Sequence, residues 1–233
     1  MTRYLFDPEP VAAVPMRGND ALYPVRRIFC VGRNYAAHAA EMGGEVDREA
    51  PFYFTKTPFH LCASGRTLPY PPGTGSYHHE MELAFTLARP VFRAERDEAG
   101  AAIHGYAAAL DMTRRDLQDA AKAARRPWSL SKDVEGAAIL APLTPADAMG
   151  EIGPQRITLT VNGETRQDAR LSEMIHDCAG IVAHLSGYYH LGPGDLILTG
   201  TPAGVGAVAP GDRIRGEIDG LDPVELTIGA PEG

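Results

Sequence analysis

Two glutamates stand two residues apart in a short run that is otherwise typical of a β-strand. In residues 77–85 (Tyr-His-His-Glu-Met-Glu-Leu-Ala-Phe), Glu80 and Glu82 share one face, opposite Met81 and Leu83. Two carboxylates this close beside apolar residues need a cation or a solvent channel, because otherwise one of them stays protonated. The pair indicates a metal site, with an exposed strand edge as the alternative.

A third carboxylate follows another buried run. The apolar segment 105–110 leads directly into Asp111. A carboxylate at the end of a buried strand is costly unless it is paired or coordinated. Asp111 is therefore the third candidate ligand.

A histidine and a glutamate near the N-terminus have the spacing of a catalytic pair. A short helix is predicted over residues 35–42, with Asn34 as its N-cap, and it places His38 and Glu41 three residues apart on one face. A carboxylate that orients an imidazole is the arrangement that a general base needs. The alternative is an incidental surface ion pair. The polar segment 45–50 that follows is either a lid or a solvated connection.

Basic residues between the last candidate ligand and residue 132 could bind an anion. Those of segment 114–126, for which we predict a helix capped by Thr113, alternate with Asp116 and Asp119, so they are interpreted as a solvated helix face. Lys132 lies instead in a mostly uncharged stretch. It is either a surface lysine or, beside a metal site, a group that fixes a substrate anion.

The elements that must position these residues are predicted to be mostly strands. Strands are expected at 27–32 and 51–56, and Asn162-Gly163 predicts a hairpin between two β-prone runs. One helix is predicted over 173–188, and residues 93–104 are expected to form a charged hairpin-like excursion. A glycine-rich loop at 200–206 has no lysine, so it is not a P-loop, and its N–H groups and Thr201 could face a carboxylate.

Composition sets the class of protein. The chain has 233 residues, of which 44% are hydrophobic and 22% charged, with 25 glycines and 19 prolines. These values indicate one globular, turn-rich domain, which we place at residues 25–233 after an arm or edge strand at 1–24. The net charge of −8 argues against a nucleic-acid surface.

Cysteine usage and the start of the chain bear on its compartment. The three cysteines, Cys30, Cys62 and Cys178, show no metal-ligand spacing and are predicted to be reduced. The first residues contain no continuous apolar segment, and no run approaches membrane-spanning length. We therefore expect a cytoplasmic protein with no membrane partner.

Taken in order, the motifs resemble those of the fumarylacetoacetate hydrolase family over about residues 26–222. They are Val31-Gly32-Arg33-Asn34-Tyr35 with His38 and Glu41, His79-Glu80-Met81-Glu82-Leu83, the segment 111–118 (Asp-Met-Thr-Arg-Arg-Asp-Leu-Gln), Val161-Asn162-Gly163-Glu164, and Gly194-Asp195 with the loop that ends at Gly206. The resemblance implies an α+β, mainly β fold, a mixed β-sandwich roll with few helices, and a homodimer.

The resemblance also implies roles for individual residues. Mg²⁺ or Mn²⁺ would be held by Glu80, Glu82 and Asp111, and the His38–Glu41 pair would activate water. Around the substrate it implies Lys132, which we also count as catalytic, together with Gln118, Gly200 and Thr201. Three carboxylates on a divalent cation leave a charge of −1, and a 2,4-diketo acid makes it −2, so a cation is needed: Lys132 first and Arg33 second.

Within the family, these motifs and segment 127–132 (Pro-Trp-Ser-Leu-Ser-Lys) most resemble short acylpyruvate hydrolases, especially those that convert fumarylpyruvate to fumarate and pyruvate in gentisate-type aromatic catabolism. Ligation by oxygen alone favours Mg²⁺ or Mn²⁺ over zinc. The alternatives are decarboxylation of a β-keto acid such as oxaloacetate, isomerisation or decarboxylation of a catabolic diacid, and a non-catalytic β-rich module that binds a structural ion.

Overall fold

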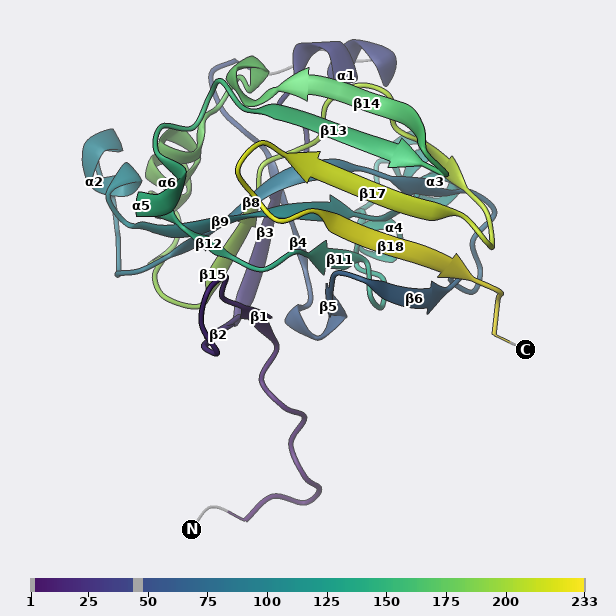
Figure 1. Ribbon diagram of the computed structural model, residues 1–233, viewed down its shortest axis with the longest axis horizontal. Helices are drawn as coiled ribbons and strands as arrows, with labels where there is room; N and C mark the ends of the chain where they lie inside the picture. Colours follow the sequence, from purple (N-terminus) through teal and green to yellow (C-terminus); the bar gives the residue numbers. More distant parts are fainter. Residues whose placement is uncertain (1–2, 44–47, 233) are drawn as a thin grey trace.

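The metal-ligand candidates lie on a curled central sheet. The computed structural model describes residues 3–43 and 48–232, in which this eight-stranded sheet has the order β4-β3-β15-β8-β9-β11-β5, with β12 paired to β9 (Figure 1). Its strands are β3 (Arg27–Val31), β4 (Tyr53–Lys56), β5 (Leu61–Ala63), β8 (Met81–Leu87), β9 (Ile103–Asp111), β11 (Ala138–Leu140), β12 (Thr144–Pro145) and β15 (Asp195–Leu198).

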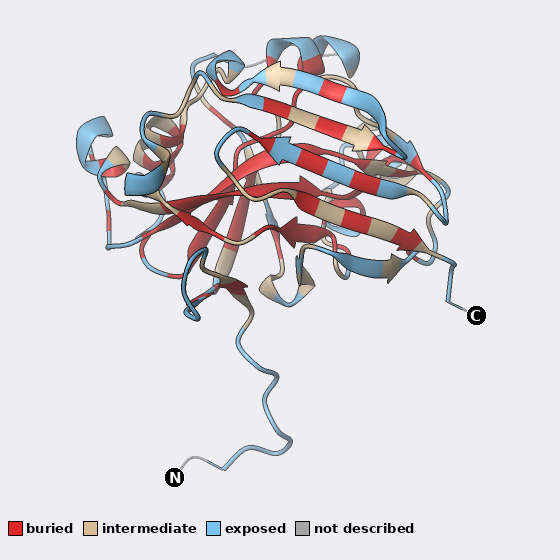
Figure 2. Cartoon of the chain, viewed as in Figure 1, coloured by how far each residue is buried: buried red, intermediate tan, exposed pale blue. Residues whose placement is uncertain are grey.

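A second sheet covers one face of the first. Its order is β14 (Glu164–Arg170), β13 (Arg156–Val161), β17 (Arg213–Ile218), β18 (Val224–Gly229) and β6 (Arg66–Pro69). Buried and exposed residues alternate along β17, whereas β8 is buried throughout, as Figure 2 shows. Met81 and Leu83 pack into one core with Ile214 of this sheet, so the glutamate-free face of β8 forms the sandwich interface.

A glycine lies at a point of close packing between the sheets. A Cβ on Gly216 of β17 would lie 2.2 Å from Sδ of Met81 and 2.9 Å from Cγ1 of Val224, so a side chain here would displace both core residues. The predicted hairpin also forms, with positive φ at Asn162 (53°) and Gly163 (83°). The predicted mainly β architecture is confirmed.

Two smaller sheets complete the described fold. Strands β10 (Thr113–Arg114), β7 (Tyr77–His79) and β16 (Gly206–Val208) form one of them, and β1 (Ala13–Pro15) pairs with β2 (Leu22–Pro24) in the other. Residues 3–11 before β1 are exposed and extend away from the domain (Figure 1).

The helices are short and lie at the periphery. They are α1 (Ala36–Glu41), α2 (Arg96–Gly100), α3 (Arg115–Ala123), α4 (Ser129–Lys132), α5 (Ala146–Met149) and α6 (Cys178–Ser186), with 3₁₀ turns η1 (Pro58–His60) and η2 (Leu171–Glu173). Within the described ranges, no helix is long and apolar enough to cross a membrane. The three cysteines are free, as predicted.

Several predicted boundaries are wrong for identifiable reasons. The segment 93–104 contains α2 and not a hairpin. The helix predicted at 173–188 begins only at Cys178, because the Asp177 side chain caps it by accepting a hydrogen bond from the Gly180 N–H at 2.9 Å. Thr113 does not cap α3, because its hydroxyl donates to the Asp111 carbonyl at 3.2 Å.

Asn34 was expected to cap α1 but is used elsewhere. Tyr35 occupies the N-cap position, without a side-chain hydrogen bond. The buried Asn34 amide donates to the carbonyls of His176 and Thr199, both at 2.8 Å, and accepts from the His176 N–H at 2.7 Å. Asn34 therefore joins the start of α1 to the segments before α6 and after β15. The first half of the segment 45–50, for which a lid was one interpretation, lies outside the described residues, which omit 44–47.

Candidate metal centre and active site

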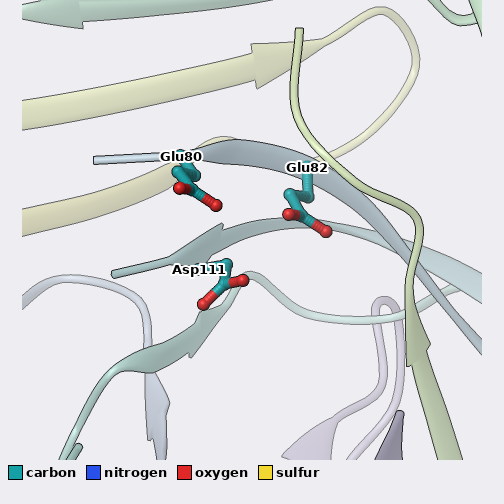
Figure 3. Close-up of side chains that lie close together, drawn as sticks. All are labelled: Glu80, Glu82 and Asp111. Atoms are coloured by element: carbon teal, nitrogen blue, oxygen red, sulfur yellow. The ribbon is translucent and has the colours of Figure 1, made fainter. Parts of the chain in front are cut away.

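Three carboxylates converge at one end of the paired strands β8 and β9. Glu80 precedes β8, Glu82 lies on it and Asp111 ends β9, and the Asp111 N–H donates to the Glu80 carbonyl at 2.9 Å. The three side chains point toward a shared space (Figure 3), and one oxygen from each lies within 4.8 Å of the others. All three are almost completely buried, with exposures of 4%, 1% and 0%.

Two of these carboxylates are paired with buried cations. Lys132 Nζ, at the end of α4, contacts Glu80 Oε2 at 2.6 Å and Asp111 Oδ2 at 2.8 Å. Lys56 Nζ contacts Asp111 Oδ1 at 2.7 Å, and Arg115 donates to Glu80. Burial opposes ionisation of Glu80, but Lys132 and Arg115 together hold its pKa well below the usual range. Burial likewise disfavours the charged form of Lys132, yet Asp111 and Glu80 raise its pKa.

The remaining carboxylate is in a different electrostatic position. Glu82 Oε2 accepts a hydrogen bond from the Gly200 N–H at 2.7 Å. Burial, and then the nearby charges of Asp111 and Glu80, raise the pKa of Glu82 well above its usual value. A divalent cation would remove this penalty, and three carboxylate oxygens this close together suit Mg²⁺ or Mn²⁺. The residues present therefore fit an oxygen-ligated cation.

The candidate general base lies beside this centre. On α1, His38 Nδ1 is 3.3 Å from Glu41 Oε2, the contact expected for residues three apart in a helix. Both carboxylate oxygens of Glu41 lie 3.1 Å from the Gly204 N–H. Burial is the main influence on His38 and lowers its pKa, although the negative charge of Glu80 acts in the opposite direction. The imidazole, only 4% exposed, is therefore neutral near pH 7.

Of the residues expected around the substrate, some already use their hydrogen-bond donors within the protein. Gln118 is buried on α3, where its side-chain oxygen accepts a hydrogen bond from Arg115, and Arg33 is partly buried beside β3. The Thr201 hydroxyl donates to the Met81 carbonyl at 2.8 Å, so its donor is used within the protein. The Gly200 N–H is likewise committed to Glu82.

Sequence reasoning missed two cations of this centre. Arg115 was placed on a solvated helix face, which is wrong: it is 6% exposed and contacts Glu80 and Gln118. Lys56 was not singled out, although in the predicted strand 51–56 it has the same parity as Phe52 and Phe54. A lysine that alternates with two phenylalanines in a predicted strand was the available signal.

Comparison with known proteins agrees with this geometry. Residues 27–229 match the family described as fumarylacetoacetate (FAA) hydrolase C-terminal. The chain is 47% identical over 193 residues to a fumarylpyruvate hydrolase of Ralstonia sp, which covers 82% of this chain and 100% of that protein. It is 39% identical over 199 residues to an oxaloacetate tautomerase of Escherichia coli (strain K12), covering 85% and 90% respectively.

A solved structure shows the same fold. The crystal structure of fumarylpyruvate hydrolase from Pseudomonas aeruginosa, in complex with Mn²⁺ and pyruvate, superposes with a TM-score of 0.94 at 42% identity, covering 98% of this chain and 100% of that one. The chain is thus an enzyme of the class that hydrolyses carbon–carbon bonds. It belongs to the fumarylacetoacetate hydrolase family.

Proposed function

We propose that this protein is a metal-dependent acylpyruvate hydrolase, with fumarylpyruvate as its substrate and fumarate and pyruvate as products. The observation that carries the proposal is a buried carboxylate trio, Glu80, Glu82 and Asp111, with an oriented histidine beside it. Similarity to fumarylpyruvate hydrolases of Ralstonia and Pseudomonas supports the choice of substrate.

The three carboxylates would hold Mn²⁺ or Mg²⁺. When bound, the cation supplies Lewis-acid stabilisation of the negative charge that develops on the pyruvate part of the substrate. Lys132 remains charged beside Glu80 and Asp111, so it offsets the negative charge that the diketo acid adds. Arg33 and Gln118 are proposed as further substrate contacts. For Gly200 and Thr201 the role is indirect, through the contacts with Glu82 and Met81.

His38 is proposed as the base. Because Nδ1 faces Glu41, Nε2 is the nitrogen that accepts a proton from water. The oxygen of that water adds to the C4 carbonyl carbon, the C3–C4 bond breaks, and its electron pair goes to C3. C3 takes up a proton to become the methyl group of pyruvate, while the acyl part leaves as the second acid.

The direct test follows loss of the diketo-acid absorbance with fumarylpyruvate, acetylpyruvate and oxaloacetate in parallel, with and without Mn²⁺ or Mg²⁺. We expect metal-dependent hydrolysis with the highest kcat/KM on fumarylpyruvate. Absence of turnover on both acylpyruvates in the presence of metal would overturn the proposal. Elution as a homodimer in size-exclusion chromatography is a separate expectation that follows from the family.

Oxaloacetate chemistry is the second candidate. It is favoured by the 39% identity to the oxaloacetate tautomerase of Escherichia coli. Decarboxylation or tautomerisation of oxaloacetate needs no attacking water, so a His38→Ala enzyme should retain decarboxylation while it loses hydrolysis. Oxaloacetate turnover that exceeds fumarylpyruvate hydrolysis in wild-type protein would place this activity first.

A further inference from the structure

A single buried glutamine joins the second sheet to the metal centre. Gln167 is the buried, 0% exposed residue of β14, whose other described side chains are exposed or partly exposed. Its Oε1 accepts from the Met81 N–H at 3.0 Å and contacts His79 Nδ1 at 3.2 Å. Its Nε2 donates to the Thr201 hydroxyl and to the Pro202 carbonyl, both at 2.8 Å. Both donors and both acceptor positions of the amide are therefore used.

These contacts surround the metal-ligand candidates. Met81 is the residue between Glu80 and Glu82, so the bond to its N–H acts on the backbone that sets the separation of the two carboxylates. The Thr201 hydroxyl returns a hydrogen bond to the Met81 carbonyl, and the neighbouring Gly200 N–H holds Glu82. Gln167 and Thr201 thus hold the N–H and the carbonyl of one residue.

The same loop reaches the general base. In the glycine-rich loop, the Gly204 N–H holds Glu41, the partner of His38. Gly204 has a φ of +94°, and a Cβ there would lie 2.0 Å from the carbonyl oxygen of Arg166. Strand β14 therefore packs against the loop at Arg166 and binds it at Gln167.

We propose that Gln167 is a positioning residue that sets the spacing of Glu80 and Glu82 and aligns Glu41 through the glycine-rich loop. The inference rests on the metal site of the proposed function but not on the identity of the substrate. Packing alone does not need an amide here, since a methionine would fill a similar volume without four hydrogen-bonding groups. Residues that orient metal ligands through hydrogen bonds change affinity when they are replaced.

The test compares Gln167→Met, Thr201→Val and the double variant by titrating the substrate-free protein with Mn²⁺ and following free Mn²⁺ by electron paramagnetic resonance. We expect Gln167→Met to weaken Mn²⁺ binding by about 10- to 100-fold. Because both side chains act on Met81, the double variant should bind Mn²⁺ with about the same affinity as the single variant that binds it less tightly. Asp168→Asn is the matched control: Asp168 is next to Gln167 on β14, and the substitution removes only the charge of an exposed pair with Arg156 of β13.

Activity gives a second measurement. At saturating Mn²⁺, kcat of Gln167→Met should remain below the wild-type value, because added metal does not restore the alignment of Glu41. Three outcomes would each overturn the proposal. Folded Gln167→Met could bind Mn²⁺ as tightly as wild type, or lose no more Mn²⁺ affinity than Asp168→Asn. The losses of Mn²⁺ affinity in the two single variants could also add in the double variant. If Gln167→Met does not fold, Thr201→Val must itself weaken Mn²⁺ binding. A wild-type enzyme without acylpyruvate hydrolysis would reject the proposed function while the Mn²⁺ titrations still decide this inference.

Discussion

The metal centre and the His38–Glu41 pair are proposed to act in the same reaction, but different structural elements hold them in place. The carboxylates lie on the paired strands β8 and β9 or, for Glu80, directly before β8, and they are at most 4% exposed. The pair is carried by α1, a helix of 6 residues, and the Glu41 side chain is 35% exposed. One region is fixed by sheet hydrogen bonds and buried cations, the other by a 3.3 Å contact and the Gly204 N–H.

This difference separates binding from rate. Buried charges depend on their partners, so changes in the metal centre should alter metal affinity and stability together. Changes in the His38–Glu41 pair, which lies on a short helix outside the sheet, should alter the rate while the fold and the metal site persist. Four substitutions test this separation, from the largest expected effect to the smallest.

Replacing Glu82 by alanine should have the largest effect. The variant loses one of three candidate ligands, so specific Mn²⁺ binding and metal-dependent hydrolysis should both be abolished. Isothermal titration with Mn²⁺ and the diketo-acid assay measure the two losses. Glu217→Ala, which removes an exposed carboxylate of β17, should leave both unchanged. Wild-type activity that survives extensive chelation would contradict a metal role for this site.

His38→Ala should lower kcat by about 10²- to 10⁴-fold, the range for loss of a general base. Mn²⁺ affinity should stay within a fewfold of wild type, because His38 is not one of the candidate ligands Glu80, Glu82 and Asp111. Steady-state kinetics and Mn²⁺ titration of the same preparation give both values. Near-full hydrolase activity in this variant would sink the assignment of His38 as the base.

Lys56→Met tests the buried cations as stabilising groups. Removal of one partner from a buried ion pair costs about 3–5 kcal/mol, so urea unfolding in the absence of metal should show a loss of this order. Saturating Mn²⁺ should restore part of it, because the cation supplies positive charge next to Asp111. The control is Arg156→Gln, which breaks an exposed pair with Asp168 and should change the midpoint little. Equal unfolding midpoints for the two variants would contradict the prediction.

Glu41→Gln should have the smallest effect and should appear mainly in the pH profile. Burial lowers the pKa of His38, while Glu80 and Glu41 raise it. Only neutral His38 accepts a proton, so activity should fall as the pH drops through this pKa. Without the Glu41 charge the pKa drops further, and the acid limb of kcat/KM should move to lower pH. A shift to higher pH would contradict the assigned pairing, and His38→Ala should lack this limb.

Local rules account for what could be predicted within single segments. The two-residue period of a strand puts Glu80 and Glu82 on one face, and the 3.6-residue period of a helix puts Glu41 beside His38. Turn chemistry located the hairpin at Asn162-Gly163. These features were accessible because they depend on backbone geometry over a few residues.

The sequence by itself thus determined the mainly β fold, the pairs within each motif and, with the family motifs, the three candidate ligands. Only the tertiary structure decided which cations meet them. Lys56 comes from an edge strand and Arg115 from a helix that was interpreted as solvated. The neutral amide of Gln167 reaches the backbone between Glu80 and Glu82 from the second sheet. Sheet curvature and strand register bring these segments together, and no local period encodes either. For the same reason Asn34 forms long-range hydrogen bonds where a helix cap was expected.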